Sequence, residues 1–180
     1  MNNYCAFLRG VNVNGRKLLM ADACRVLGDA GMGQVSSLLA SGNLVFAADE
    51  PQAQLRPLLE RALSAHMGDP VSLFVKSSGE LEQLLAAQPF EPRADRRIHA
   101  FLCEPGFEIT LLDAFEQISP ADGEAAQIVD GFFYWQCPKG ATLDSGFSKI
   151  LGRKDMREKF TSRNIATIVK VLQRMSAMAG

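Results

Sequence analysis

The sequence has little of what disulfide and metal chemistry require. Its 180 residues include four cysteines and two histidines. The cysteines lie far apart, with no CxxC pair and no Cys/His pair at metal-ligand spacing: Cys5, Cys24, Cys103 and Cys137. His66 and His99 have no cysteine or carboxylate partner in the pattern, which favours core or surface roles. We therefore expect reduced thiols, no metal site and no cofactor.

The chain also lacks the features of membrane proteins and of familiar hydrolases. It has no run of about 18 apolar residues, and its N-terminus lacks the basic-then-apolar order of a signal peptide. No GxSxG motif and no Ser/His/Asp arrangement of recognisable spacing is present. With 47% hydrophobic and 22% charged residues, the composition is typical of a soluble globular protein. We expect a cytoplasmic protein without a membrane partner. The sequence assigns no catalytic residue, reaction or oligomeric state.

The two signs of charge are distributed unevenly along the chain. The formal net charge is -1, yet residues 139–174 contain nine Lys or Arg against three Asp or Glu. This segment therefore carries +6 and the remainder -7. Such an asymmetry indicates an anionic partner better than the net charge does.

The first half alternates strand and helix signals. Apolar residues at 4–8 indicate a buried strand, and apolar residues at helical spacing follow over 19–30. Two apolar stretches within 34–46 flank Ser41, Gly42 and Asn43, residue types that suit a tight hairpin. A second helical stripe and a strand at 71–76 complete the order strand, helix, hairpin, helix, strand. This order predicts an α+β, ferredoxin-like sandwich of the βαββαβ type.

The second half repeats this order after a break. Ser77 and Glu80 form a capping box for a helix, and prolines and polar residues over 89–97 then predict a linker. The strand at 98–102 and the elements after it match the first half, which is consistent with an internal duplication. We expect an N-terminal ferredoxin-like lobe at 1–88, a linker at 89–97, and a C-terminal α+β lobe at 98–180 with basic terminal helices.

The basic C-terminal segment is expected to form two helices, over about residues 147–159 and 163–178, with Thr161 or Ser162 as the second N-cap. Lys149, Arg153 and Arg157 are four residues apart, so on one helix they would form a positive stripe. The alternative interpretation is an ordinary solvated face.

The stretch FLRGVNVNGRK ends the first strand with a loop that delivers three cations, Arg9, Arg16 and Lys17. A P-loop needs Lys directly after its last glycine and then Ser or Thr, and neither is present, which excludes a nucleoside triphosphatase of that type. A glycine-containing turn between strand and helix still exposes N–H groups that can hold an anion. The alternative is that the loop glycines and asparagines serve only turn geometry.

These features lead to one ligand-binding hypothesis. Cations from the first loop and from the C-terminal segment would bind a phosphate-bearing or other anionic ligand in a cleft between the lobes. Arginine suits this task because its planar fork matches phosphate and carboxylate. The predicted ligand-binding residues are Arg9, Asn12, Arg16, Lys17, Ser41, Asn43, Ser148, Lys149, Arg163 and Asn164. Hairpin chemistry alone is a sufficient alternative explanation of Ser41 and Asn43.

Two other functions stay open. A nucleic-acid (RNA) binding module is one, because ferredoxin-like sheets and a +6 segment both suit a phosphate backbone. The aromatic run at 132–135 is more typical of a strand core, although an exposed sheet face could stack bases. The other is a structural or oligomerising protein with no small ligand.

Three separated motifs resemble a bacterial family, domain of unknown function 1697. FLRGVNVNGRK is similar to the family's FLRGINVGG-like opening, SGNLVF at 41–46 to its SGNVVF, and the late SK and TSRN to its SK and TTRN motifs. Asn14 replaces the first glycine of the family's GG pair, and Ile165 stands where an aromatic residue is usual. The resemblance covers nearly the whole chain. It implies a two-lobed α+β protein of ferredoxin-like topology and names no reaction.

Overall fold

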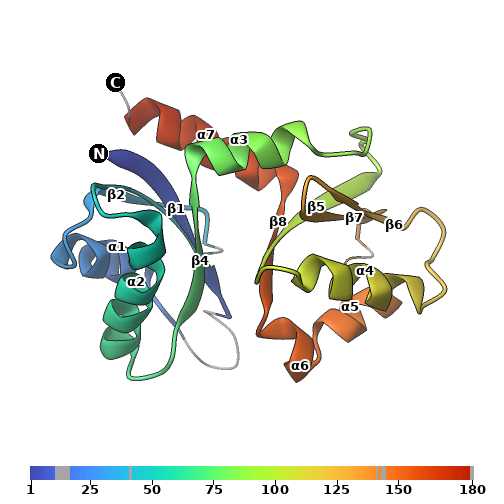
Figure 1. Ribbon diagram of the computed structural model, residues 1–180, viewed down its shortest axis with the longest axis horizontal. Coiled ribbons are helices and arrows are strands. Elements are labelled where there is room, and N and C mark those ends of the chain that lie inside the picture. The colour runs from blue at the N-terminus through green and yellow to red at the C-terminus, as the bar shows by residue number, and fades with distance from the viewer. Residues whose placement is uncertain (11–16, 41, 141, 143–144, 179–180) are drawn as a thin grey trace. The chain divides into compact units, whose positions relative to one another are not determined.

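The computed structural model describes residues 1–10, 17–40, 42–140, 142 and 145–178 (Figure 1). The chain divides into two compact units, unit 1 with Met1–Glu82 and Val169–Gly180, and unit 2 with Gln83–Ile168. The division falls inside two helices, α3 (Ser78–Ala86) and α7 (Ile165–Met178). The predicted limits of the two lobes stay a prediction.

Unit 1 contains a four-stranded antiparallel sheet, sheet A, and two helices. Its elements are β1 (Asn2–Arg9), α1 (Met20–Asp29), β2 (Gly33–Leu38), β3 (Asn43–Ala48), α2 (Gln52–Met67) and β4 (Ser72–Ser77). The strand order is β2-β3-β1-β4, and each neighbouring pair is antiparallel. This is the predicted ferredoxin-like arrangement.

Unit 2 repeats the arrangement with a second sheet, sheet B, in the order β6-β7-β5-β8. Its elements are β5 (Arg96–Cys103), α4 (Phe107–Glu116), β6 (Ala125–Val129), β7 (Phe132–Pro138), α5 (Gly146–Leu151), α6 (Lys154–Arg157) and β8 (Phe160–Asn164). β5 begins at Arg96, inside the predicted linker, because Arg96 and Arg97 already pair with the end of β7. The prediction of two ferredoxin-like subdomains is confirmed.

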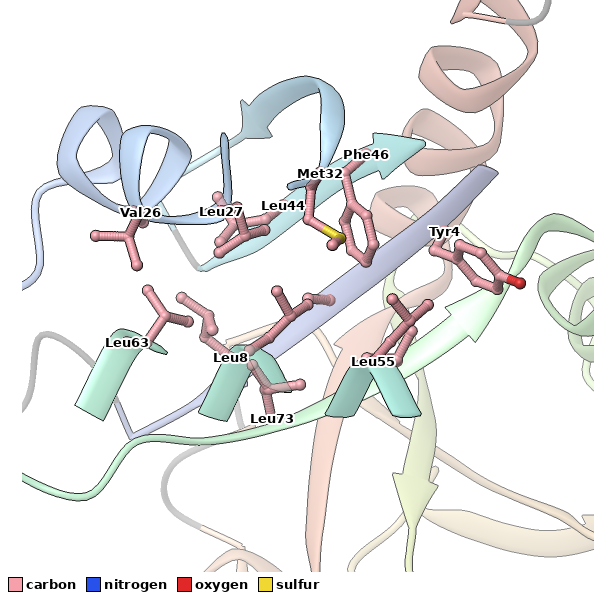
Figure 2. Packing of buried hydrophobic residues seen from close by; sticks show 14 of the residues in the cluster. Tyr4, Leu8, Val26, Leu27, Met32, Leu44, Phe46, Leu55, Leu63 and Leu73 are labelled. Carbon is pink, nitrogen blue, oxygen red and sulfur yellow. The ribbon is translucent and has the colours of Figure 1, made fainter. Parts of the chain in front are cut away.

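The core of unit 1 follows from the alternation of β1. Tyr4, Ala6 and Leu8 face the helices, and the intervening Cys5 and Phe7 are equally buried on the opposite face. On α2, three leucines four residues apart belong to this core: Leu55, Leu59 and Leu63. Figure 2 shows Leu55 and Leu63 pointing toward the side chains of the sheet. Each of them is fully buried, which at roughly 25 cal/mol per Å² of apolar area stabilises the unit strongly.

The core of unit 2 is aromatic. The Phe101 ring centroid lies 4.9 Å from that of Phe133 and 5.1 Å from that of Phe160. Phe147 of α5 meets Phe115 of α4 at 5.2 Å in an edge-to-face geometry. Edge-to-face and tilted pairs at these distances add to the stabilisation from buried area. The aromatic residues of β7 therefore belong to the strand core, as the sequence pattern indicates.

The prediction of two C-terminal helices is wrong in part. Instead of one helix over 147–159, the chain forms the short α5 and α6, which are separated by Gly152 and Arg153. Residues 160–164, expected to cap the last helix, form the strand β8, because they pair with β5 over the register Ala100↔Arg163. Lys149, Arg153 and Arg157 therefore do not share one helix, and Arg153 pairs with Asp155 at 2.8 Å.

Candidate functional site

One end of sheet A brings several predicted site residues together. β1 stops at Arg9, and the backbone N–H of Leu8 donates to the Gly42 carbonyl at 2.8 Å. Phe7 is the register partner of Asn43, so Arg9, Phe7 and Asn43 lie on the same face of the sheet. Gly10 follows with a left-handed φ of 61°, which turns the chain away from the strand. This end of unit 1, called the β1 end below, is the meeting point of Arg9 and the β2–β3 hairpin.

Asn43 serves the hairpin at this end. It is fully buried, and its Nδ2 donates to the Leu38 carbonyl at 2.8 Å, across the turn that joins β2 to β3. Leu39 in that turn has a φ of 59°, a value that costs a leucine energy, and its side chain is 48% exposed. The pairing of β2 with β3 confirms the predicted hairpin. In this geometry Asn43 positions the turn rather than facing solvent.

Of the other predicted ligand-binding residues in the first half, the structure describes Lys17 alone. Lys17 is exposed and comes three residues before α1. Asn12, Arg16 and Ser41 lie outside the described residues. Of the three cations predicted for the first loop, the structure describes Arg9 and Lys17.

In unit 2, the predicted residues Ser148 and Lys149 lie in α5, and Asn164 lies at the end of β8. Ser148 lies in α5, where its backbone N–H donates to Ser145 Oγ at 3.0 Å and its hydroxyl donates to the Thr142 carbonyl. Lys149 is exposed. Asn164 ends β8, and its Oδ1 accepts from the Ala166 N–H at 2.8 Å, so it caps α7. Each of the two polar side chains satisfies local backbone groups.

Arg163 is a buried cation on the face of sheet B opposite to Asn164. Its exposed fraction is 9%, and Nη1 donates to Thr161 Oγ1 and to the Ser162 carbonyl, both at 2.8 Å. Because successive residues of a strand point to opposite faces, Arg163 and Asn164 cannot serve the same surface of the sheet. The shared cleft between the lobes stays a prediction.

A charged cluster at the start of α3 is structural. Glu80 accepts from Gln52 Nε2 at 2.6 Å, from Lys76 Nζ at 2.8 Å and from the Ser77 N–H at 2.9 Å. Burial raises the pKa of Glu80, but these hydrogen bonds outweigh burial, so its pKa is lowered overall. The bond from the Glu80 N–H to Ser77 Oγ at 3.3 Å completes the predicted capping box.

Sequence reasoning missed a polar group on the helix-covered face of sheet B. His99 stacks on Trp135 with ring centroids 5.4 Å apart, and Asn164 is its neighbour on the other side. Burial, and then the charge of Arg97, lowers the pKa of His99 to about 4. The pattern placed His99 in a strand, but it could not show which side chains of β7 and β8 lie beside it, because those pairings are nonlocal.

Among the side chains that the structure describes, no three His, Cys, Asp or Glu are arranged to hold a metal ion. None of the four cysteines forms a disulfide. No helix within the described ranges combines the length and the apolar character needed to cross a membrane.

Fold and geometry thus define a protein of two ferredoxin-like subdomains. The chain belongs to the family described as "Protein of unknown function (DUF1697)", whose model matches residues 1–134. This confirms the family that the sequence resembles; the late SK and TSRN motifs lie outside the matched residues. No curated protein matches the chain.

Two solved structures extend the comparison. The conserved bacterial protein SP0830 from Streptococcus pneumoniae is 23% identical with a TM-score of 0.78, over 98% of this chain and 99% of that one. An unknown protein from Galdieria sulphuraria is 9% identical with a TM-score of 0.28, over 98% of this chain and 92% of that one. The first likeness supports the fold. The second, with its low TM-score, supports no conclusion about the fold.

Proposed function

We propose that the protein binds a small anionic ligand, such as a phosphate-bearing metabolite, at the β1 end of unit 1. The observation that supports this proposal is the position of Arg9, which ends a buried strand beside the Gly42 turn. A second cation, the exposed Lys17, follows Arg9 by eight residues along the chain. A guanidinium and an ammonium group suit a phosphate or carboxylate.

The other two functions have less support. Base stacking needs accessible rings, but Phe133 and Tyr134 are fully buried and Trp135 is 2% exposed. The Tyr134 hydroxyl donates to the Leu84 carbonyl at 2.6 Å, so this strand is already covered within its own chain. Neither an RNA-stacking face nor a dimer built on the β7 aromatic residues gains an observation in its favour.

The test compares two arginines of unit 1. Arg9→Ala should weaken binding of inorganic phosphate, glycerol phosphate or a nucleoside monophosphate at least tenfold, because a charge-assisted hydrogen bond contributes about 1.5–3 kcal/mol. Arg25→Ala is the matched control, since Arg25 is exposed on α1 and pairs with Asp22 and Asp29. Isothermal titration calorimetry and thermal unfolding with each probe measure the effect.

Equal binding by Arg9→Ala and the wild type would remove the β1 end as the site. Weaker binding at higher ionic strength is expected for an electrostatic contact. Arg163→Ala is not a clean probe of ligand binding, because it should also lower the stability of the ligand-free protein. Its guanidinium is buried and hydrogen-bonded, so its removal leaves buried acceptors without a donor.

A further inference from the structure

The strand β6 is an edge of sheet B, because the strand order is β6-β7-β5-β8 (Figure 1). Its hairpin with β7 turns through residues 130–131, whose positive φ values of 50° and 78° are typical of a two-residue type I′ turn. The pair Val129↔Phe132 beside such a turn is hydrogen-bonded, and hydrogen-bonded and non-hydrogen-bonded pairs alternate from there. The backbone N–H and C=O groups of Ala126 and Ile128 therefore point away from β7.

Nothing in the described part of the chain hydrogen-bonds to these four outward groups. The edges of sheet A are protected differently. Side chains of α2 bond to β4, and β2 shifts its register between Gly33 and Ser36, where Arg174 donates to the Ser36 hydroxyl. By contrast, β6 pairs with β7 over five successive residues without a shift, and its sequence AAQIV has no charge and no proline. A regular, uncharged edge strand is a template for pairing with another strand.

The chain around β6 is acidic. Residues 98–138 contain seven Asp or Glu and no Lys or Arg, whereas residues 1–97 contain ten residues of each charge sign. The excess of acid therefore comes from the stretch that contains β6 and α4, the helix that packs on it. Four of the seven acidic residues are exposed, and they lie on α4 or near the ends of β6: Asp113, Glu116, Asp122 and Asp130. Arg96, which packs against Gly123, offsets part of this charge.

We propose that the β6 edge binds an extended, basic segment of another protein, which adds to sheet B as a further strand. The backbone of this segment exchanges hydrogen bonds with Ala126 and Ile128. Its Lys or Arg side chains lie among the exposed acids, near Asp122 at one end of β6 and near Asp130 at the other. This surface belongs to unit 2 and is independent of the phosphate site proposed at the β1 end.

A second copy of the chain fits this edge less well. In the antiparallel register that uses all four outward groups, Ala126 of one copy pairs with Ile128 of the other. Glu124 then stands opposite Asp130, and like charges directly opposite each other destabilise a sheet. A basic segment is attracted by the same charges, so charge complementarity favours it as the occupant.

Amide hydrogen exchange, followed by NMR, tests the edge directly. In the free protein, the amides of Ala126 and Ile128 should exchange about tenfold faster than that of Gln127, which bonds to β7. The probe is the peptide Arg-Lys-Val-Thr-Val-Thr-Val-Lys-Arg, which should slow the two outward amides about tenfold when it is added in millimolar excess. Equal protection of all three amides in the free protein, or no slowing by the peptide, would overturn the proposal.

Two matched peptides separate strand addition from charge alone. One carries N-methyl groups on its five central residues, so it keeps every charge but has no central N–H donor. The other has Glu in place of each Lys and Arg. Fluorescence anisotropy of labelled peptides should show about tenfold weaker binding for each, because backbone pairing and charge both contribute. Equal binding by the N-methylated peptide would mean attraction without strand addition and would refute the proposal.

Charge variants test the acidic surface. Asp130→Asn keeps the turn, because asparagine tolerates a positive φ, and Asp122→Asn changes an exposed position. The double variant should bind the basic peptide about fivefold more weakly, since each exposed charge contributes modestly. Glu91→Gln, at an exposed acid outside residues 98–138, is the matched control and should bind as the wild type does. Equal binding by the double variant and the wild type would contradict the proposal.

Ala126→Pro blocks the edge itself, because proline lacks the outward N–H and leaves the bonds to β7 in place. It should bind the peptide about tenfold more weakly, and its thermal unfolding shows whether it folds. If the variant does not fold, hydrogen exchange in the wild type and the charge variants decide. If the wild type sediments as a dimer that Ala126→Pro dissociates, a second copy occupies the edge and the proposal is wrong.

Discussion

At the scale of single residues, burial determines the charge of His99. Its ring stacks on Trp135, and desolvation disfavours the imidazolium more than Arg97 alone could. The folded-state pKa of about 4 lies below the ordinary value of 6.5, so the folded protein keeps this ring neutral near pH 7. The stability of the fold is thereby linked to pH through one side chain.

The sign of this linkage gives a prediction. Between pH 6.5 and about 4, the unfolded chain binds a proton at His99 that the folded chain does not. The stability that comes from keeping His99 neutral is therefore fully present above pH 6.5. It is lost as the pH falls toward 4, which lowers the free energy of unfolding by about 3 kcal/mol at most. In His99→Gln, the free energy of unfolding should decline less steeply over this range, as measured by urea denaturation at several pH values. His66→Gln, at an exposed position of α2, should keep the wild-type slope.

At the scale of elements, α2 closes the free edge of sheet A. β4 is an edge strand, and three side chains of α2, four or eight residues apart, satisfy its outward backbone groups. Ser64 Oγ accepts from the Val71 N–H at 2.8 Å, and Glu60 Oε1 accepts from the Leu73 N–H at 3.0 Å. Gln52 Nε2 donates to the Val75 carbonyl at 3.1 Å. One stripe of α2 therefore packs the core, and the stripe next to it blocks edge-to-edge pairing.

Glu60→Ala should destabilise sheet A at its β4 edge. Without the carboxylate, the Leu73 N–H loses its acceptor and the Arg56 guanidinium loses a partner at 3.1 Å. We expect a loss of about 1–3 kcal/mol in the free energy of unfolding, together with a greater tendency to associate. Urea denaturation and light scattering measure the two effects. Glu60→Gln, which keeps an acceptor oxygen, should recover part of the stability, and the exposed Glu82→Ala should change little. Wild-type stability in Glu60→Ala would contradict this role.

Elements whose signals are local could be predicted from the sequence, and elements that depend on distant pairing could not. The Ser77–Glu80 capping box and the β2–β3 hairpin involve neighbouring residues, so their residue types are sufficient. β8 has the polar sequence of a helix start, and it becomes a strand only because β5 offers it a free edge. The same pairing separates Arg163 from Asn164, which no local pattern of that segment could indicate.

At the scale of the whole molecule, the last helix returns to the first unit. The Asn3 Nδ2 donates to the Met175 carbonyl at 2.9 Å, and the Arg174 Nε donates to Ser36 Oγ at 3.1 Å. Both contacts join residues at opposite ends of the sequence, so unit 1 is completed only when the C-terminal residues are in place. The family motifs and the repeated element order predicted two lobes, but the pattern of the last helix did not show that part of it belongs with unit 1.

A core substitution in this last helix should therefore weaken unit 1. Met175 is 1% exposed, and Met175→Ala should cost about 2–5 kcal/mol, since a large buried side chain leaves a cavity. Amide hydrogen exchange should accelerate in β1 and β2, which hold the partners of this segment, more than in β5 and β7. Gln173→Ala, an exposed change on the same helix, is the control and should leave exchange unaltered. If protection fell equally in both sheets, the two units would unfold as one cooperative body, and the assignment of the C-terminal segment to unit 1 would have no energetic meaning.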